Sequence, residues 1–101
     1  MLRIVDAAVA ISDPIRRRVL ELVRDRELPA GELAAEFEVS RPAVSRHLRV
    51  LREAGLVHER REGRLRLYRA DLTPLGELRE WLDGYWSGRL DALKRVAEEE
   101  R

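Results

Sequence analysis

Two helical segments joined by a very short turn constrain this chain more than any other feature. Residues 41–54 follow Ser40, whose side chain can accept a hydrogen bond from a helix-start N–H, and they stop at Gly55, a residue favoured just past helix ends. Pro42 fits the first turn, where its missing N–H costs nothing. A shorter apolar-periodic segment, residues 32–37, ends about three residues earlier, which is the spacing of a helix-turn-helix.

Cap signals also predict two helices ahead of this pair. Residues 2–11 place apolar side chains at helical spacing, but the segment is short and needs something larger to pack against. Asp13 can cap the next helix, and Pro14 suits its first position.

A period-two pattern and a final helix follow the helix-turn-helix. Strands near 56–61 and 65–70 are expected to form a β-hairpin with Gly63 at its tip, although the first strand alternates less cleanly. Thr73 opens a last helix with apolar residues at steps of three and four. The order predicts an α+β fold of four helices, a hairpin and a fifth helix, in one domain over residues 1–101.

The segment 41–54 is amphipathic in a way that suits a DNA recognition helix. At 100° per residue, Val44, Leu48 and Leu51 share one face. Arginine can donate two hydrogen bonds to a guanine edge, and serine can bond bases or phosphates. The residues expected on the opposite face to enter a major groove are Arg41, Pro42, Ser45, Arg46 and Arg49.

The distribution of charge supports a polyanionic partner. The chain as a whole carries a net charge of +1, but residues 40–69 hold nine arginines against three glutamates, and the remainder is net negative. The alternative is a solvated helix face in a chain that uses arginine almost exclusively as its basic residue.

The hairpin extends this basic surface. Arg61 and Arg64 flank Gly63 and are expected to contact the DNA backbone or the minor groove, whereas Arg69 is expected to be structural. The alternative is that these charges protect exposed strand edges from pairing. His47 falls nearer the buried helix face and is expected to be a partly buried, hydrogen-bonded residue.

The two ends of the chain carry more apolar surface than one small core needs. Either they close the core of a monomer or they build a two-fold dimer, and we favour the dimer. The residues expected at its interface are Leu2, Val5, Val9, Leu82, Tyr85, Trp86, Leu90 and Leu93.

Several functions are not indicated by the sequence. Cysteine is absent, the two histidines form a weak metal constellation, and no nucleophile–base set or phosphate-binding loop is present, so we expect neither catalysis nor a cofactor nor a metal. No apolar run approaches the roughly 20 residues of a membrane span, and no secretion signal is recognisable, so a cytoplasmic location is expected.

Residues 40–57, SRPAVSRHLRVLREAGLV, followed by a basic glycine turn and Tyr68, resemble the ArsR/SmtB-like bacterial repressors. Residues 12–16, SDPIR, are similar to the second helix of that family. The resemblance implies a winged helix-turn-helix that dimerises through its first and last helices. It also implies binding to a palindromic operator in double-stranded DNA, usually as a repressor.

The chain departs from the metal-sensing members of this family. Their Cys-x-Cys motif falls on Pro29 and Gly31, and the last helix has no histidine, so the chain resembles the branch without these metal sites. The effector stays unknown. Two alternatives remain at this point: a winged helix that binds proteins, and a small-molecule sensor whose pocket is lined by the aromatic residues of the last helix, although such residues more often simply pack.

Overall fold

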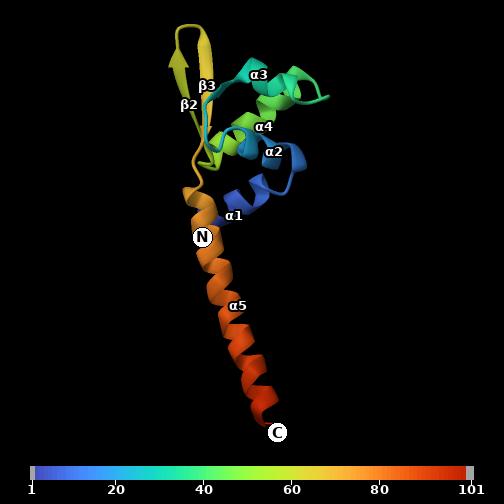
Figure 1. Cartoon of the computed structure of the whole chain (residues 1–101), viewed down its shortest axis with the longest axis vertical. Helices are drawn as coiled ribbons and strands as arrows, with labels where there is room; N and C mark the ends of the chain where they lie inside the picture. Colours follow the sequence, from blue (N-terminus) through green and yellow to red (C-terminus); the bar gives the residue numbers. More distant parts are fainter. Residues whose placement is uncertain (1, 100–101) are drawn as a thin grey trace.

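The computed structural model describes residues 2–99, apart from the side chains of Leu2, Trp86, Arg89 and Leu90. Four short helices and a small sheet form a body, from which the last helix projects (Figure 1). The elements in chain order are α1 (Leu2–Ala10), α2 (Pro14–Leu22), β1 (Leu28–Pro29), α3 (Ala30–Ala35), α4 (Arg41–Glu53), β2 (Val57–Glu62), β3 (Leu65–Ala70) and α5 (Thr73–Glu99).

The predicted helix boundaries around α2 and α4 are confirmed. The Asp13 carboxylate accepts hydrogen bonds from the backbone N–H groups of Ile15 at 2.8 Å and Arg16 at 3.1 Å. The Ser40 hydroxyl accepts from the N–H of Ala43 at 3.3 Å. Gly55 follows α4 with a φ of 75°, a left-handed conformation that costs glycine little.

Two features differ from the sequence expectation. The helix expected at 32–37 ends at Ala35, because the N–H groups of Glu36 and Phe37 bond three residues back instead of four, which tightens the last turn. The link to α4 is therefore longer than expected. The strand β1 was not predicted, because two residues ending in Pro29 carry no periodic signal; it pairs with β3 and completes a sheet in the order β1-β3-β2.

The core lies where α2, α3, α4 and the sheet meet. Leu33, Leu51 and Leu56 are completely buried there. Burial of a leucine side chain stabilises a fold by roughly 1.5–3 kcal/mol, so these residues hold α3, α4 and the start of the hairpin in one orientation.

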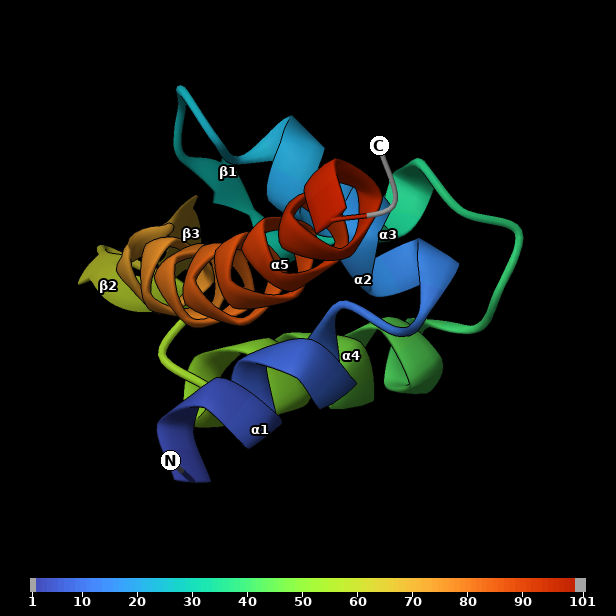
Figure 2. The same ribbon diagram turned by 90° about the horizontal axis from the view of Figure 1, so that it is seen from below.

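The last helix does not join this core along most of its length. Only its first turns are covered: Pro74 is buried, Leu75 and Leu78 are half-buried, and α1 packs against this end (Figure 2). The molecule measures 67 × 25 × 23 Å, with a radius of gyration of 18.2 Å. A compact chain of this length would have about 13 Å, so the described apolar side chains beyond the first turns of α5 do not close a monomer core. No helix in residues 2–99 is long and apolar enough to cross a membrane.

Candidate nucleic-acid interface

The recognition-helix pattern is reproduced by α4. Val44, Leu48 and Leu51 are at most 3% exposed and face the core, as predicted. The residues of the opposite face are exposed, namely Arg41, Pro42, Ser45, Arg46 and Arg49. Because these three buried side chains hold α4 against the core, its opposite face is a rigid surface.

The arginines of residues 40–69 divide into two groups. Three are ion-paired: Arg52 and Arg66 with Glu59, and Arg60 with Glu27. The others make no ion pair with any carboxylate in the described part of the chain; they are Arg41, Arg46, Arg49, Arg61, Arg64 and Arg69. All five arginines predicted from the sequence to contact DNA belong to this second group. Their contact with DNA stays a prediction.

The strand register separates the hairpin residues onto two faces. Glu59 lies opposite Tyr68 and Arg61 lies opposite Arg66, so these four side chains share the face turned toward α4. Arg60 is on the other face. There it donates to the Glu27 carboxylate at 2.7 and 3.0 Å, which lowers the pKa of Glu27 and raises that of Arg60. Arg60 therefore attaches the hairpin of β2 and β3, which is the wing of the fold, to the segment before β1.

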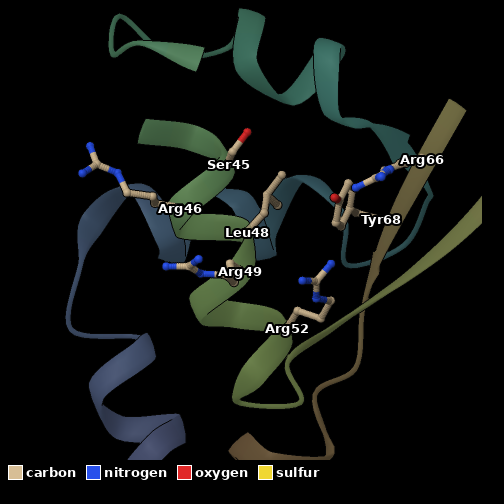
Figure 3. Close-up of a pocket in the computed structure, with 7 residues that line it drawn as sticks. All are labelled: Ser45, Arg46, Leu48, Arg49, Arg52, Arg66 and Tyr68. Atoms are coloured by element: carbon tan, nitrogen blue, oxygen red, sulfur yellow. The ribbon is translucent and has the colours of Figure 1, made fainter. Parts of the chain in front are cut away.

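An open groove of about 240 Å³ runs between α4 and the wing (Figure 3). It is lined by Ser45, Arg46, Leu48, Arg49, Arg52, Arg66 and Tyr68. The Tyr68 hydroxyl donates to Glu59 at 3.3 Å, and burial together with that carboxylate raises the pKa of Tyr68. The sequence reasoning missed the grouping of Arg66, Tyr68 and Glu59, which only the strand register brings together.

His47 is a partly buried, hydrogen-bonded residue, as predicted. Its side chain is 19% exposed, and its Nδ1 lies 3.2 Å from the Arg16 guanidinium and 4.0 Å from the Asp13 carboxylate. Because a guanidinium can only donate, Nδ1 is the acceptor of this hydrogen bond. Burial would raise the pKa of Asp13, but the N–H groups of Arg16 and Ile15 outweigh it and the pKa lies below its usual range.

Arg16 is a structural residue that sequence reasoning missed. Besides His47, it donates to the carbonyl oxygens of Ala10 at 2.6 Å and Val9 at 3.2 Å. The Val9 carbonyl also accepts from the N–H of Ser12 at 3.1 Å and from its hydroxyl at 2.6 Å. The Ala10 carbonyl lies at the very end of α1, beyond which the helix supplies no further backbone donor. One side chain thus connects α1, α2 and α4.

A second junction links the wing to α5. His58 on β2 lies 2.8 Å from a carboxylate oxygen of Asp71, whose other oxygen accepts from the N–H of Thr73 at 3.0 Å. The side chain and N–H of Thr73, followed by His58, lower the pKa of Asp71 to about 2. Asp71 is therefore ionised at neutral pH and caps the start of α5.

The predicted dimer residues lie on exposed surface where the structure describes them. Val5 and Val9 project from α1, and Leu82, Tyr85 and Leu93 project from α5. The side chains of Leu2, Trp86 and Leu90 lie outside the described residues. Trp81 and Tyr85 stack on each other with ring centroids 6.1 Å apart. The interface stays a prediction.

Metal-ligating side chains are scattered in the structure. Within the described residues, no group of three or more histidine, cysteine, aspartate or glutamate side chains lies close enough to hold a metal ion.

Comparison with known proteins agrees with this geometry. Residues 13–59 match the model of a family described as bacterial regulatory protein, arsR family. The chain is 42% identical over 91 residues to the HTH-type transcriptional regulator Rv2034 of Mycobacterium tuberculosis, covering 90% of this chain and 85% of that protein. It is 36% identical over 73 residues to the transcriptional repressor SdpR of Bacillus subtilis, covering 72% and 81%. The solved structure of an ArsR-like transcriptional regulator from Rhodococcus sp. RHA1 superposes with a TM-score of 0.83 at 32% identity, covering 97% and 93% of the two chains.

Proposed function

Because the chain belongs to the ArsR family of bacterial regulatory proteins, we propose that it acts as a homodimer that recognises a palindromic operator. Its fold is the winged helix-turn-helix, and its biochemical role is that of a DNA-binding transcriptional repressor. We place its action in the cytoplasm, where a bacterial regulator meets its operator.

One observation carries the assignment of the contact surface: three exposed arginines of α4, Arg41, Arg46 and Arg49, pair with no described carboxylate, unlike Arg52 at the end of the same helix. Arg46 and Arg49 project from a helix anchored by buried leucines, and they make no ion pair with a described carboxylate. Free guanidinium groups on a rigid helix are suited to donate to guanine edges in the major groove. Pro42 adds an apolar contact at the helix start, and Arg41 and Ser45 complete the surface.

The wing extends the contact to the flanking backbone. Arg61 and Arg64 lie near the hairpin tip, where Gly63 turns the chain with a φ of 60°. Their charges are not used inside the described fold, so they remain available for phosphates or for a narrow minor groove. We expect Arg64→Ala to weaken binding to all duplexes alike.

The exposed part of α5 supports the dimer. A single helix that leaves its body gains little from its own hydrogen bonds, because most helix stability in proteins comes from packing. Leu82, Leu93 and Val96 are 38%, 64% and 53% exposed on this helix. Pairing of α5 and α1 with a second copy would cover them and set two α4 helices about one DNA turn, roughly 34 Å, apart.

The test is a fluorescence-anisotropy titration with DNA from the chain's own upstream region, using a scrambled duplex as control, at two salt concentrations. Tight, salt-sensitive binding that favours the upstream duplex is expected, at two chains per duplex. Sedimentation equilibrium without DNA should give twice the mass of the 11.7 kDa chain. Absence of binding to either duplex at low salt would contradict the assignment of the surface, and a monomer at every concentration would contradict the dimer.

A further inference from the structure

We propose that the groove between α4 and the wing binds one backbone phosphate of DNA. Arg52 and Arg66 would donate hydrogen bonds to this phosphate, and Glu59 is their internal counter-ion. This inference rests on the proposed function and adds to it a sequence-independent contact. None of these three residues belongs to the contact surface assigned above.

Three elements bring the donors together. The two donors are Arg52, from the last turn of α4, and Arg66, from β3. Their counter-ion, Glu59, comes from β2. The Glu59 carboxylate accepts from Arg52 at 2.6 Å, pairs with Arg66 at 3.7 Å and accepts from the Tyr68 hydroxyl at 3.3 Å. One carboxylate thus contacts two guanidinium groups and one phenol, which come from α4 and β3.

The exposure of the three charged side chains shows which charge meets solvent. The Glu59 side chain is 16% exposed, whereas Arg52 is 46% and Arg66 is 53% exposed. The carboxylate therefore lies beneath the guanidinium groups. An anion that enters from outside meets the arginine donors first, and these donors are already held in place, which lowers the entropy lost on binding.

The charge of the groove also favours an anion. Four arginines line it, including Arg46 and Arg49 from the middle of α4, against the single carboxylate of Glu59. Its volume of about 240 Å³ and its opening to solvent leave room for a phosphodiester group.

The shape of the duplex explains why a phosphate would reach this position. A recognition helix in the major groove and a wing that reaches toward the adjacent minor groove stand on opposite sides of one sugar-phosphate strand. The groove runs between these two elements, and Arg52 and Arg66 lie on its opposite walls (Figure 3). The strand that separates the two DNA grooves would therefore lie across it.

The test uses the full chain and a mixed-sequence duplex of about 30 base pairs, because a phosphate contact carries no sequence information. The variants are Arg52→Ala and Arg66→Ala. The matched control is Arg60→Ala, which removes an ion-paired arginine from the same hairpin but from its other face. Thermal unfolding is followed for each variant, so that a loss of binding can be separated from a loss of fold.

Each groove variant is expected to weaken binding on the order of tenfold at about 0.1 M salt. It should also lower the slope of log affinity against log salt by about 0.9 for each protomer, while Arg60→Ala leaves that slope unchanged. Glu59→Gln keeps a carbonyl oxygen for Arg52 but removes a negative charge. It should tighten binding a few-fold and steepen the slope.

Three results would overturn the proposal. The first is a slope of log affinity against log salt that stays the same in both groove variants. The second is a slope that falls equally in Arg60→Ala, and the third is weaker DNA binding by Glu59→Gln with its fold intact. In each of these cases the unaltered protein still binds DNA, so the proposed function stands. If the unaltered chain fails to bind the duplex even at low salt, the proposed function fails and the groove proposal fails with it.

Discussion

The exposed face of α4 and the exposed stretch of α5 are both uncovered in a single chain, but for opposite chemical reasons. The α4 face carries guanidinium groups, which water solvates well, so this surface is stable in the absence of DNA. The α5 stretch carries Leu82, Leu93 and Val96, whose exposure to water opposes folding. An exposed charged surface indicates a ligand that binds reversibly, whereas an exposed apolar helix indicates a partner that is needed to stabilise the folded state.

The strongest test of this difference places a charge in the apolar stretch of α5. Leu82→Glu places a carboxylate where we expect a second copy, and an unpaired buried charge costs about 3–5 kcal/mol. We expect the dimer dissociation constant to rise more than a hundredfold, with loss of operator binding. Sedimentation equilibrium is the measurement. Ser87→Glu, an exposed position five residues further along α5, is the control; equal loss in both variants would contradict a defined interface.

The α4 face is tested by removal of its charges. Arg46→Ala or Arg49→Ala should cost about 1–3 kcal/mol of operator binding if either residue reads a base, with no effect on dimerisation. Anisotropy titrations with operator and scrambled duplexes measure this cost. Arg95→Ala removes an exposed arginine near the far end of α5 and should change neither quantity. Unchanged operator affinity in both α4 variants would remove α4 as the reading element.

The rigidity of the α4 side of this contrast can be tested at Arg16, whose side chain connects α4 to α1 and α2. Arg16→Ala removes the side-chain donor to the Ala10 carbonyl and to the Nδ1 of His47, whereas the Val9 carbonyl keeps its hydrogen bonds from Ser12. We expect a loss of about 1.5 kcal/mol in the free energy of unfolding, because these groups are part-buried. Urea denaturation measures it, with Arg18→Ala as the exposed control on the same helix. An unaltered midpoint for Arg16→Ala would show that solvent replaces these bonds fully.

The smallest expected effect concerns Asp71, which joins the wing to α5. Its pKa is lowered to about 2 in the folded chain, below its ordinary value of 3.8. The stabilisation is therefore complete above pH 4 and is lost as the pH falls toward 2. Asp71→Asn should cost about 1 kcal/mol at neutral pH, the usual size for a helix cap, and nothing below pH 2. Denaturation at several pH values checks this; a difference that persists in acid would contradict the ionic origin.

Much of the fold was predictable because its signals are local. Asp13, Ser40 and Gly55 mark helix ends through contacts within four residues, and these predictions are confirmed. The buried face of α4 follows from a period of 3.6 residues. The early end of α3 and the strand β1 were missed, because a tightened turn and a two-residue strand leave no periodic trace.

The candidate site was predictable only in part, and the reason is distance along the chain. The sequence by itself determined which helix face carries arginine and that the basic residues gather in one third of the chain. Only the tertiary structure decided which partners individual arginines have: Arg60 pairs with the Glu27 carboxylate across 33 residues, and Arg16 donates to His47 across 31. A charge pattern shows what a segment can bind, but whether an arginine has an internal carboxylate partner, and where it can meet an external phosphate, depends on which side chains the fold brings within reach.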